Sequence, residues 1–323
     1  MILLFRAFKP LILLAMLSFI FLLGGCSEIA VLDPKGPVAS QQKDLILLSI
    51  GFMLFIVAVV FVLFTIMIVK YREHKKSTYT PEAEGNVFLE IVWTVVPILI
   101  VIALSVPTVR AIYSLEEAPK ASKDKEPLVV YATSVDWKWV FSYPEQEIET
   151  VNYLNIPTDR PILFKIASAD SMASLWIPQL GGQKYAMSGM EMEQYLQADH
   201  EGTYKGRNAN FTGEGFADQK FNVNAVSEKS FNEWVKKTQK EAPKLTKSQY
   251  DKLMLPRHAE EMTFSSTHLK YVKHGNDAEY AIKARKRLGY VPLSPHSKSD
   301  PFENVKMDKT EKHDHHSKEH DSH

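Results

Sequence analysis

The sequence contains a single cysteine in 323 residues, Cys26, and no excess charge of either sign. One cysteine excludes an internal disulfide, a four-cysteine zinc site and any metal centre that takes two thiolates from this chain. The 38 Lys and Arg residues balance the 38 Asp and Glu residues, so the summed field gives no reason to expect a polyanionic partner. Nucleic acid is therefore not expected as a partner. A chain of this length has room for one ordinary domain together with membrane segments and extensions.

The first 25 residues have the layout of an export signal. Arg6 and Lys9 precede an apolar run, 11–23, which ends in small residues just before Cys26. This run is shorter than the roughly 20 residues that a membrane span needs. The sequence Leu-Gly-Gly-Cys at 23–26 resembles a bacterial lipobox, which implies cleavage before Cys26 and a thioether-linked diacylglycerol on its sulfur. The alternative is a first transmembrane helix that happens to contain a cysteine.

Two later segments are long and apolar enough to cross a membrane. Residues 45–69 carry no charge, and at about 1.5 Å per residue they exceed a hydrocarbon layer of about 30 Å. Residues 91–109 form a second uncharged run, whose two prolines are tolerated in membrane helices. Four Lys and Arg residues in the short loop 70–76 mark that loop as cytoplasmic. The export signal and the loop charges thus predict the same hairpin, with both flanks outside.

The segment after the polar linker 116–126 has the character of a β domain. Short apolar or alternating runs are bounded by Pro, Gly, Asn and Asp, as in an antiparallel sandwich or barrel. A capping-box pattern at Ser230 and Glu233 then predicts an amphipathic helix that closes the sandwich. The expected strands are 128–133, 137–142, 150–154, 161–166, 175–177, 183–187, 203–211 and 221–226.

The C-terminal part is charged and helix-prone from Pro243 to about residue 288, and the sequence offers no role for it. Five of the eleven histidines lie in the last eleven residues, a tract that either binds divalent metals weakly or is a solvated end. The expected organisation is a signal peptide (1–25), an outer linker (26–44), a first span (45–69), a cytoplasmic loop (70–90), a second span (91–113), a linker (114–126), a β domain (127–242), a helical extension (243–293) and a disordered His-rich tail (294–323).

Several motifs occur in the order seen in subunit II of haem-copper oxidases. They are the run from Glu90 to Pro97 that opens the second span, Trp137-Lys138-Trp139, residues 170–178 and Phe231-Asn232-Glu233-Trp234. Residues 134–139, the run Tyr143-Pro144-Glu145-Gln146 and the lipobox are similar to the quinol-oxidising branch of that family. The closest resemblance is to the haem-aa3 menaquinol oxidases of Gram-positive bacteria. It covers roughly residues 40–240 and implies a cupredoxin-like sandwich of Greek-key type for the outer domain.

The copper chemistry of that family can be compared with this sequence residue by residue. Cytochrome c oxidases hold a binuclear copper centre in this domain, with a histidine after Asp-x-x and a later run Cys-x-x-x-Cys-x-x-x-His-x-x-Met. Here the first histidine position, three residues after Asp170, is Ala173. The resemblance implies a domain that binds no metal, because none of the five side-chain ligands is kept. The other positions fall on Asn208 and Thr212 for the cysteines, Phe216 for the histidine, Gln219 for the methionine, and Asn210 where a glutamate would lend its backbone carbonyl.

An oxidase without that copper cannot take electrons from cytochrome c by the usual route, so a lipid quinol, menaquinol or ubiquinol, is the expected donor. The resemblance implies that the haems and the remaining copper lie in subunit I, and that this chain supports electron transfer in a proton-pumping complex while carrying no catalytic residue or redox group. The implied partners are subunit I, further membrane subunits and membrane lipid, at the bacterial cell membrane with the C-terminal domain on the extracellular face. The alternative is a non-enzymatic cupredoxin-like lipoprotein for oxidase assembly, which should keep soft ligands at matched spacing.

Three further features have a functional and a structural interpretation. The resemblance implies that Glu90 marks the mouth of a proton path, although a glutamate in a first helical turn also suits the helix dipole. By the period of two, Trp137 and Trp139 are expected on one strand face, where packing or subunit docking is favoured over electron entry. The methionines at 187, 190 and 192 have irregular spacing, so core packing or loop contact is expected rather than copper binding.

Overall fold

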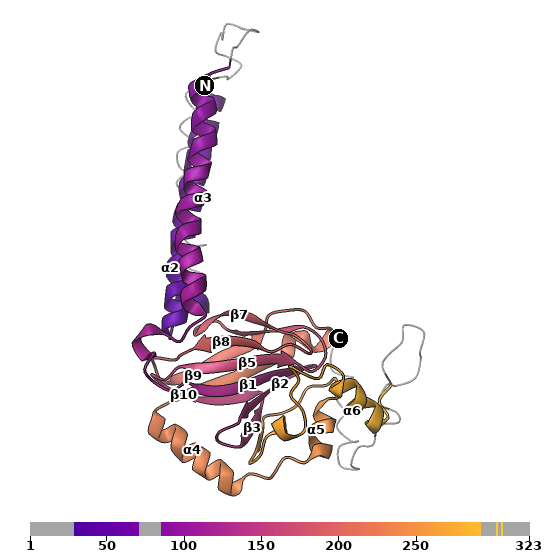
Figure 1. Ribbon diagram of the computed structural model, residues 1–323. Helices are drawn as coiled ribbons and strands as arrows, with labels where there is room; N and C mark the ends of the chain where they lie inside the picture. Colours follow the sequence, from indigo (N-terminus) through magenta and orange to yellow (C-terminus); the bar gives the residue numbers. More distant parts are fainter. Residues whose placement is uncertain (1–28, 71–84, 292–301, 303–304, 306–323) are drawn as a thin grey trace, which may run out of the picture.

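The computed structural model describes residues 29–70, 85–291, 302 and 305, and it places two long helices on one end of a β-sandwich (Figure 1). Helix α2 spans Pro37–Lys70 and helix α3 spans Val87–Leu115. At about 1.5 Å per residue, each is longer than a hydrocarbon layer of roughly 30 Å. Apolar side chains are exposed on all sides of both helices, as expected for segments that face lipid or other helices. The two predicted spans lie within these helices.

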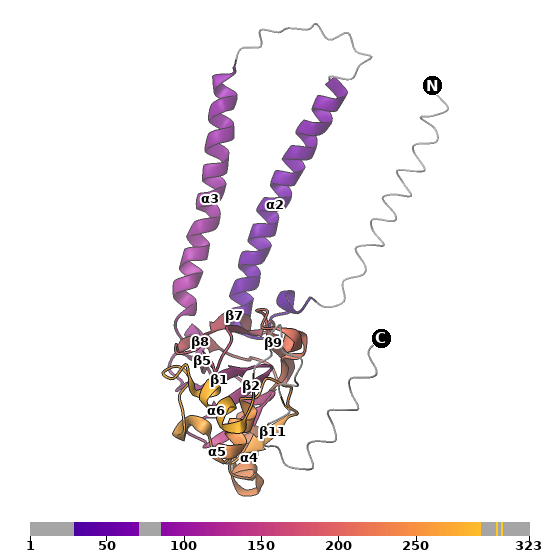
Figure 2. The same ribbon diagram turned by 90° about the vertical axis from the view of Figure 1, so that its right-hand side faces the viewer.

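The start of α3 is fixed by a side-chain cap. The side-chain oxygen Oδ1 of Asn86 accepts hydrogen bonds from the backbone N–H groups of Phe88 and Leu89, at 3.0 and 3.4 Å. Pro97 and Pro107 lie inside the helix without ending it. Figure 2 shows that α2 and α3 lie close together at the sandwich and diverge away from it.

The helical hairpin is joined tightly to the sandwich at the start of α2. A Cβ on Gly36 would lie 1.9 Å from the carbonyl oxygen of Gln197, so only glycine allows this approach. The N–H of Lys35 donates to the carbonyl of Gln179 at 2.7 Å, and the side chain of Val38 is buried in the sandwich core. The helices and the outer domain therefore share packing where they meet.

The sandwich consists of a six-stranded and a five-stranded sheet. Their strand orders are β11-β3-β2-β1-β5-β8 and β4-β10-β9-β6-β7. Most neighbours are antiparallel, but β1 pairs with β5 and β4 pairs with β10 in parallel, which the antiparallel prediction did not include. The strands are β1 Leu128–Val135, β2 Lys138–Tyr143, β3 Ile148–Val151, β4 Tyr153–Pro157, β5 Ile162–Ser168, β6 Ala173–Ile177, β7 Gly181–Ala186, β8 Met192–Leu196, β9 Gly202–Asn208, β10 Lys220–Val226 and β11 Met262–Phe264.

Aromatic side chains fill the space between the two sheets. Trp139 and Phe141 from β2 stack with ring centroids 6.3 Å apart, and both contact Phe221 from β10. All three are almost completely buried, and burial of such large apolar surfaces is the main term that holds two sheets together. The alternation of inward apolar residues that predicted the strands is the pattern that builds this core.

One predicted strand is two strands of different sheets. The expected strand 150–154 is interrupted at Asn152, whose φ of 58° turns the chain from β3 into β4. Strands β8 and β11 were not predicted. The closing helix α4 spans Glu228–Glu241 and begins earlier than expected, since Ser227 rather than Ser230 caps it, its hydroxyl oxygen accepting from the Ser230 N–H at 3.2 Å.

The extension after Pro243 is only partly helical and is built into the fold. It contains α5 Lys247–Leu253, the short η4 His268–Lys270 and α6 Tyr280–Leu288, and between them β11 pairs with β3 at the edge of the larger sheet. A second apolar cluster joins Val140 and Val151 of the sandwich to extension residues such as Tyr250 and Met254. Cys26, the loop 71–84 and the His-rich tract 313–323 lie outside the described residues.

Candidate functional site

The positions aligned with the copper ligands come together at one end of the sandwich, which we call the pole. Ala173 opens β6 and is fully buried, while Asn208 ends β9 and Gln219 immediately precedes β10. Between β9 and β10 lies the pole loop, residues 209–219, which contains η3, Glu214–Asp218. Because β9 and β10 are neighbouring antiparallel strands, residues at the two ends of this loop come into contact.

Asn208 is the centre of a closed set of hydrogen bonds. Its side-chain carbonyl accepts from the backbone N–H groups of Ser174 and Asn210, both at 2.9 Å. Its side-chain NH₂ donates to the Thr212 hydroxyl at 3.1 Å and to the Gln219 side-chain carbonyl at 2.9 Å. Asn208 is 2 % exposed, so these bonds satisfy a buried amide that would otherwise be costly.

Gln219 extends the same network into the sandwich. Its side-chain NH₂ donates to the Ser134 hydroxyl at 2.9 Å and to the Lys138 carbonyl at 3.1 Å. The donor set does not fit a binuclear copper centre, which needs soft bridging thiolates, because these amides and hydroxyls are hard ligands already engaged with one another. Within the described ranges, no group of three or more His, Cys, Asp or Glu residues is arranged to hold a metal ion.

The pole loop also carries two aromatic residues, the exposed Phe211 and the partly buried Phe216. Phe216 packs against Phe211 with ring centroids 5.7 Å apart, and Phe211 is 76 % exposed. The Asn210 side chain donates to the carbonyl of Met172, which is also exposed, at 2.6 Å. Phe211 and Met172 thus place two exposed apolar side chains at this end of the sandwich.

The two tryptophans do not share a strand face, contrary to the prediction. Trp139 lies in β2 and is fully buried in the sandwich core, whereas Trp137 precedes β2 in the turn after β1 and is half-buried. The indole N–H of Trp137 donates to the carbonyl of Thr212 at 3.0 Å, and its ring lies against Gly213 and Gly215. The period of two failed because the strand had not yet begun at Trp137.

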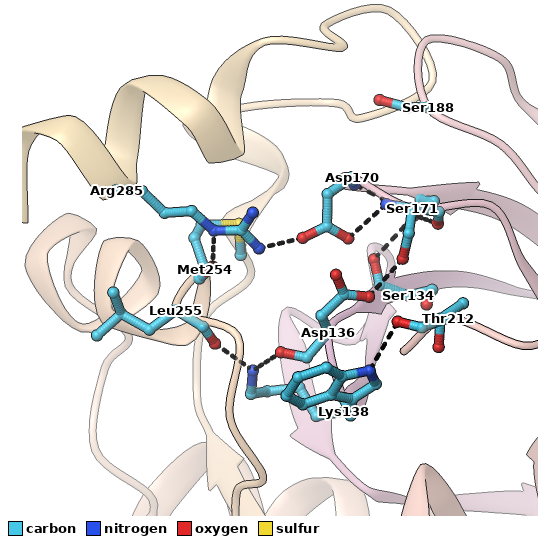
Figure 3. A network of polar contacts seen from close by, with 12 residues as sticks. Ser134, Asp136, Lys138, Asp170, Ser171, Ser188, Thr212, Met254, Leu255 and Arg285 are labelled. Carbon is cyan, nitrogen blue, oxygen red and sulfur yellow. Dashed lines mark hydrogen bonds and ion pairs between the residues drawn. The ribbon is translucent and has the colours of Figure 1, made fainter. Parts of the chain in front are cut away.

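A cluster of ionisable groups around Asp136, Lys138 and Asp170 was not predicted (Figure 3). The amine of Lys138, 1 % exposed, donates to the carbonyls of Asp136 and Leu255, both at 2.9 Å. Burial lowers the pKa of Lys138 to about 7. Burial and then the neighbouring carboxylate of Asp170 raise the pKa of Asp136 to about 6. Two ionisable groups thus titrate near neutral pH at this end of the sandwich.

The extension supplies the counter-charge to this cluster. Arg285 on α6 forms an ion pair with Asp170, and its Nε–H donates to the carbonyl of Met254 at 2.6 Å. The Ser171 hydroxyl donates to the carboxylate of Asp136 and so links the two acids (Figure 3). A lysine inside an alternating strand was a sequence signal for this cluster, but Leu255 lies 117 residues from Lys138, and Arg285 lies 115 residues from Asp170.

A second buried network holds the extension itself. The carboxylate of Glu149 accepts from the imidazole of His268 at 2.7 Å, and both side chains are fully buried. The ring of His268 stacks on Tyr250, whose hydroxyl lies 2.7 Å from Nε2 of His274. Burial lowers the pKa of His274 to about 3, so this imidazole stays neutral.

Glu90 lies apart from these networks, in the first turn of α3 at the end away from the sandwich, and is exposed in the isolated chain. The methionines form no single cluster. Met187 pairs with Met190 through an isolated backbone bridge, and Met192 in β8 packs against the main core.

Sequence comparison places the chain among named relatives. It is 77% identical over 317 residues to "Quinol oxidase subunit 2" of Bacillus subtilis (strain 168), which covers 97% of this chain and 99% of the relative. It is 52% identical over 270 residues to the protein of the same name in Bacillus cereus (strain ATCC 14579), covering 83% of this chain and 93% of the relative. The chain belongs to the quinol oxidase subunit 2 family.

Membership of this family also accounts for the helical hairpin. The family model for the transmembrane domain of cytochrome c oxidase subunit II matches residues 27–111, which include α2 and most of α3. A quinol oxidase subunit 2 is a membrane protein, as the two apolar helices indicate. Among solved structures, the periplasmic domain of subunit II of cytochrome oxidase from Bradyrhizobium japonicum is similar at 23% identity, with a TM-score of 0.34, over 37% of this chain and 94% of that one.

Proposed function

We propose that this chain is subunit II of a respiratory, proton-pumping quinol oxidase and that it binds no copper. The complex would oxidise quinol and reduce O₂ to water, with the haems and copper held by subunit I. The observation that carries the proposal is the closed amide network of Asn208 and Gln219 at the pole, in a chain whose relatives are named quinol oxidase subunit 2. These relatives favour this role over that of an assembly lipoprotein.

In this account the outer domain acts without a redox group of its own. Quinol would deliver electrons directly to a haem of subunit I, because the pole offers no thiolate to carry them. Trp137 is bound to Thr212 of the pole loop, which supports packing over electron entry as its role. The exposed Phe211, with Phe216 packed against it, would then contact a neighbouring subunit.

The membrane orientation is also a proposal. Four Lys and Arg residues at 70–76 would hold the loop between α2 and α3 in the cytoplasm, so that the sandwich lies on the extracellular face. Cys26 would carry a diacylglycerol and anchor the N-terminus on the same face. Glu90 would then lie near the cytoplasmic surface, where a carboxylate can take up protons for subunit I.

The direct test is purification of the complex from membranes. The proposal expects this chain to co-purify with a polytopic haem protein, and the complex to oxidise menaquinol or ubiquinol while leaving reduced cytochrome c unreacted. Isolation of the chain without any haem protein, together with normal oxidase activity in cells that lack it, would contradict the proposal.

A further inference from the structure

The C-terminal extension shares a core with the sandwich and is more than an appendage. Val135, Val140 and Val151, on the outer face of the larger sheet, are buried against extension residues such as Tyr250 and Met254. Strand β11 adds to the edge of the same sheet by pairing with β3. The position of the extension is therefore set by the sandwich. The extension makes further contacts with specific sandwich residues.

These contacts converge on the turn 136–138 that carries Trp137. The N–H of Arg257 donates to the Asp136 carbonyl at 3.0 Å, and the Trp137 N–H donates to the Arg257 carbonyl at 3.4 Å. The amine of Lys138 donates to the Leu255 carbonyl from the other side. The segment 136–138 is thus bound by the extension through its backbone and through the side chain of Lys138.

Arg285 is linked to the same turn through Asp170 and Ser171. It pairs with Asp170, and the neighbouring Ser171 hydroxyl donates to the carboxylate of Asp136 (Figure 3). Its Nε–H also donates to the Met254 carbonyl, next to Leu255, which binds Lys138. Lys138 from the sandwich and Arg285 from α6 therefore bind neighbouring carbonyls, those of Leu255 and Met254, in one short stretch of the extension.

Trp137 transmits this position to the pole loop. Its indole N–H donates to the Thr212 carbonyl, and a Cβ at Gly215 would lie 2.4 Å from its ring. Gly213, at φ +108°, would place a Cβ 3.3 Å from the same ring. The indole therefore lies flat on the loop backbone, and a rotation of Trp137 would displace the loop that carries Phe211 and Phe216.

We propose that the extension fixes the conformation of the pole loop by holding Trp137, with Lys138 and Arg285 as positioning residues. This gives residues 243–291 a role in shaping the surface that the outer domain presents at its pole. The order of contacts is extension, turn 136–138, Trp137, then pole loop, and each step is a hydrogen bond or a close packing contact.

Hydrogen exchange of the purified complex, read by mass spectrometry, tests this order. We expect Arg285→Ala and Lys138→Met each to speed exchange in the pole loop by tenfold or more, while strand β5 stays within twofold of the native chain. Arg287→Ala is the matched control, because Arg287 lies on the same helix but pairs with Asp251 inside the extension. It should leave the loop unchanged.

Two further variants separate positioning from general stability. Trp137→Phe keeps an aromatic ring but removes the indole N–H that bonds to Thr212, so it should loosen the loop and leave exchange in the extension unchanged. Arg285→Lys can keep the ion pair with Asp170 and should restore most of the loop protection. Native exchange in the loop of both the Arg285→Ala and Lys138→Met variants, or equal loosening by Arg287→Ala, would overturn the proposal. Exchange is measured without quinol, so its outcome does not depend on the activity proposed above.

Discussion

Amide side chains occupy the place where a copper centre would need thiolates. Asn208 and Gln219 bond to each other and to Ser174, Thr212 and Ser134, and each buried donor or acceptor of Asn208 has a partner. Such a network is stable only when it is complete, because a buried polar group that loses its partner keeps its desolvation cost. The pole is thus held by hydrogen bonds instead of a metal.

Replacement of Asn208 by alanine tests this role. Asn208→Ala leaves the buried N–H of Ser174 without its partner and removes the shorter of two hydrogen bonds to the Gln219 side-chain carbonyl, so we expect the free energy of unfolding to fall by about 2 to 3 kcal/mol. The control is Thr203→Ala, which removes an exposed hydrogen bond to Asn224 and should change stability little. Denaturant unfolding of the full chain in detergent measures both, and equal stability of the two variants would contradict the assigned role.

Lys138 gives stability a defined dependence on pH. Burial lowers its pKa in the folded chain to about 7 from 10.5, so the unfolded chain binds a proton that the folded chain lacks between these values. The contribution of Lys138 to the free energy of unfolding therefore rises with pH in this window. The free energy of unfolding of the native chain should therefore rise relative to that of Lys138→Met from pH ~7 to ~9.

The exposed Lys236 on α4 provides the comparison. Lys236→Met should leave the pH dependence of the unfolding midpoint as it is in the native chain. A Lys138→Met curve that runs parallel to the native one across this range would show that the amine is charged when folded.

Sequence predicted the members of the pole network but not the charged cluster beside it. Asn208, Thr212 and Gln219 were selected through the family resemblance, and they do meet in space. Lys138 was passed over because its partner carbonyl, on Leu255, lies 117 residues away in a segment without a predicted role. Contacts of this separation leave no periodic signal in the sequence.

At the scale of elements, strong hydrophobic periodicity was a reliable guide and weak periodicity was not. The two apolar helices and most sandwich strands lie where alternation or apolar runs predicted them. The missed strands β8 and β11 lie at the two edges of the larger sheet, and most of their residues are only partly buried. Their apolar alternation is therefore weak. The break at Asn152 depends on a left-handed residue, which a run of strand-forming side chains conceals.

The first turn of α3 carries the proposed proton entrance. Glu90→Ala should slow quinol oxidase turnover several-fold while the haem content of the complex stays normal, because loss of a carboxylate at a channel mouth affects proton uptake rather than folding. Glu116→Ala, at the opposite end of α3, is the control and should keep native turnover. Unchanged turnover of Glu90→Ala over a wide pH range would leave Glu90 with an interfacial role only.

At the scale of the whole molecule, two attachments to the membrane are proposed: a lipid on Cys26 and the hairpin of α2 and α3. Cys26→Ser should abolish incorporation of labelled palmitate and leave the signal uncleaved. The chain should stay in the membrane fraction because the two apolar helices remain. Palmitate label that persists in the serine variant would contradict the lipid assignment.

The central claim is that this chain belongs to an oxidase fed by quinol and carries no copper of its own. Electron paramagnetic resonance of the purified complex tests it most directly, with a copper-bearing cytochrome c oxidase as the reference sample. We predict no mixed-valence binuclear copper signal, because Asn208, Thr212 and Gln219 supply only hard, mutually bonded ligands. A stoichiometric signal of that kind, accompanied by rapid oxidation of reduced cytochrome c, would contradict the account.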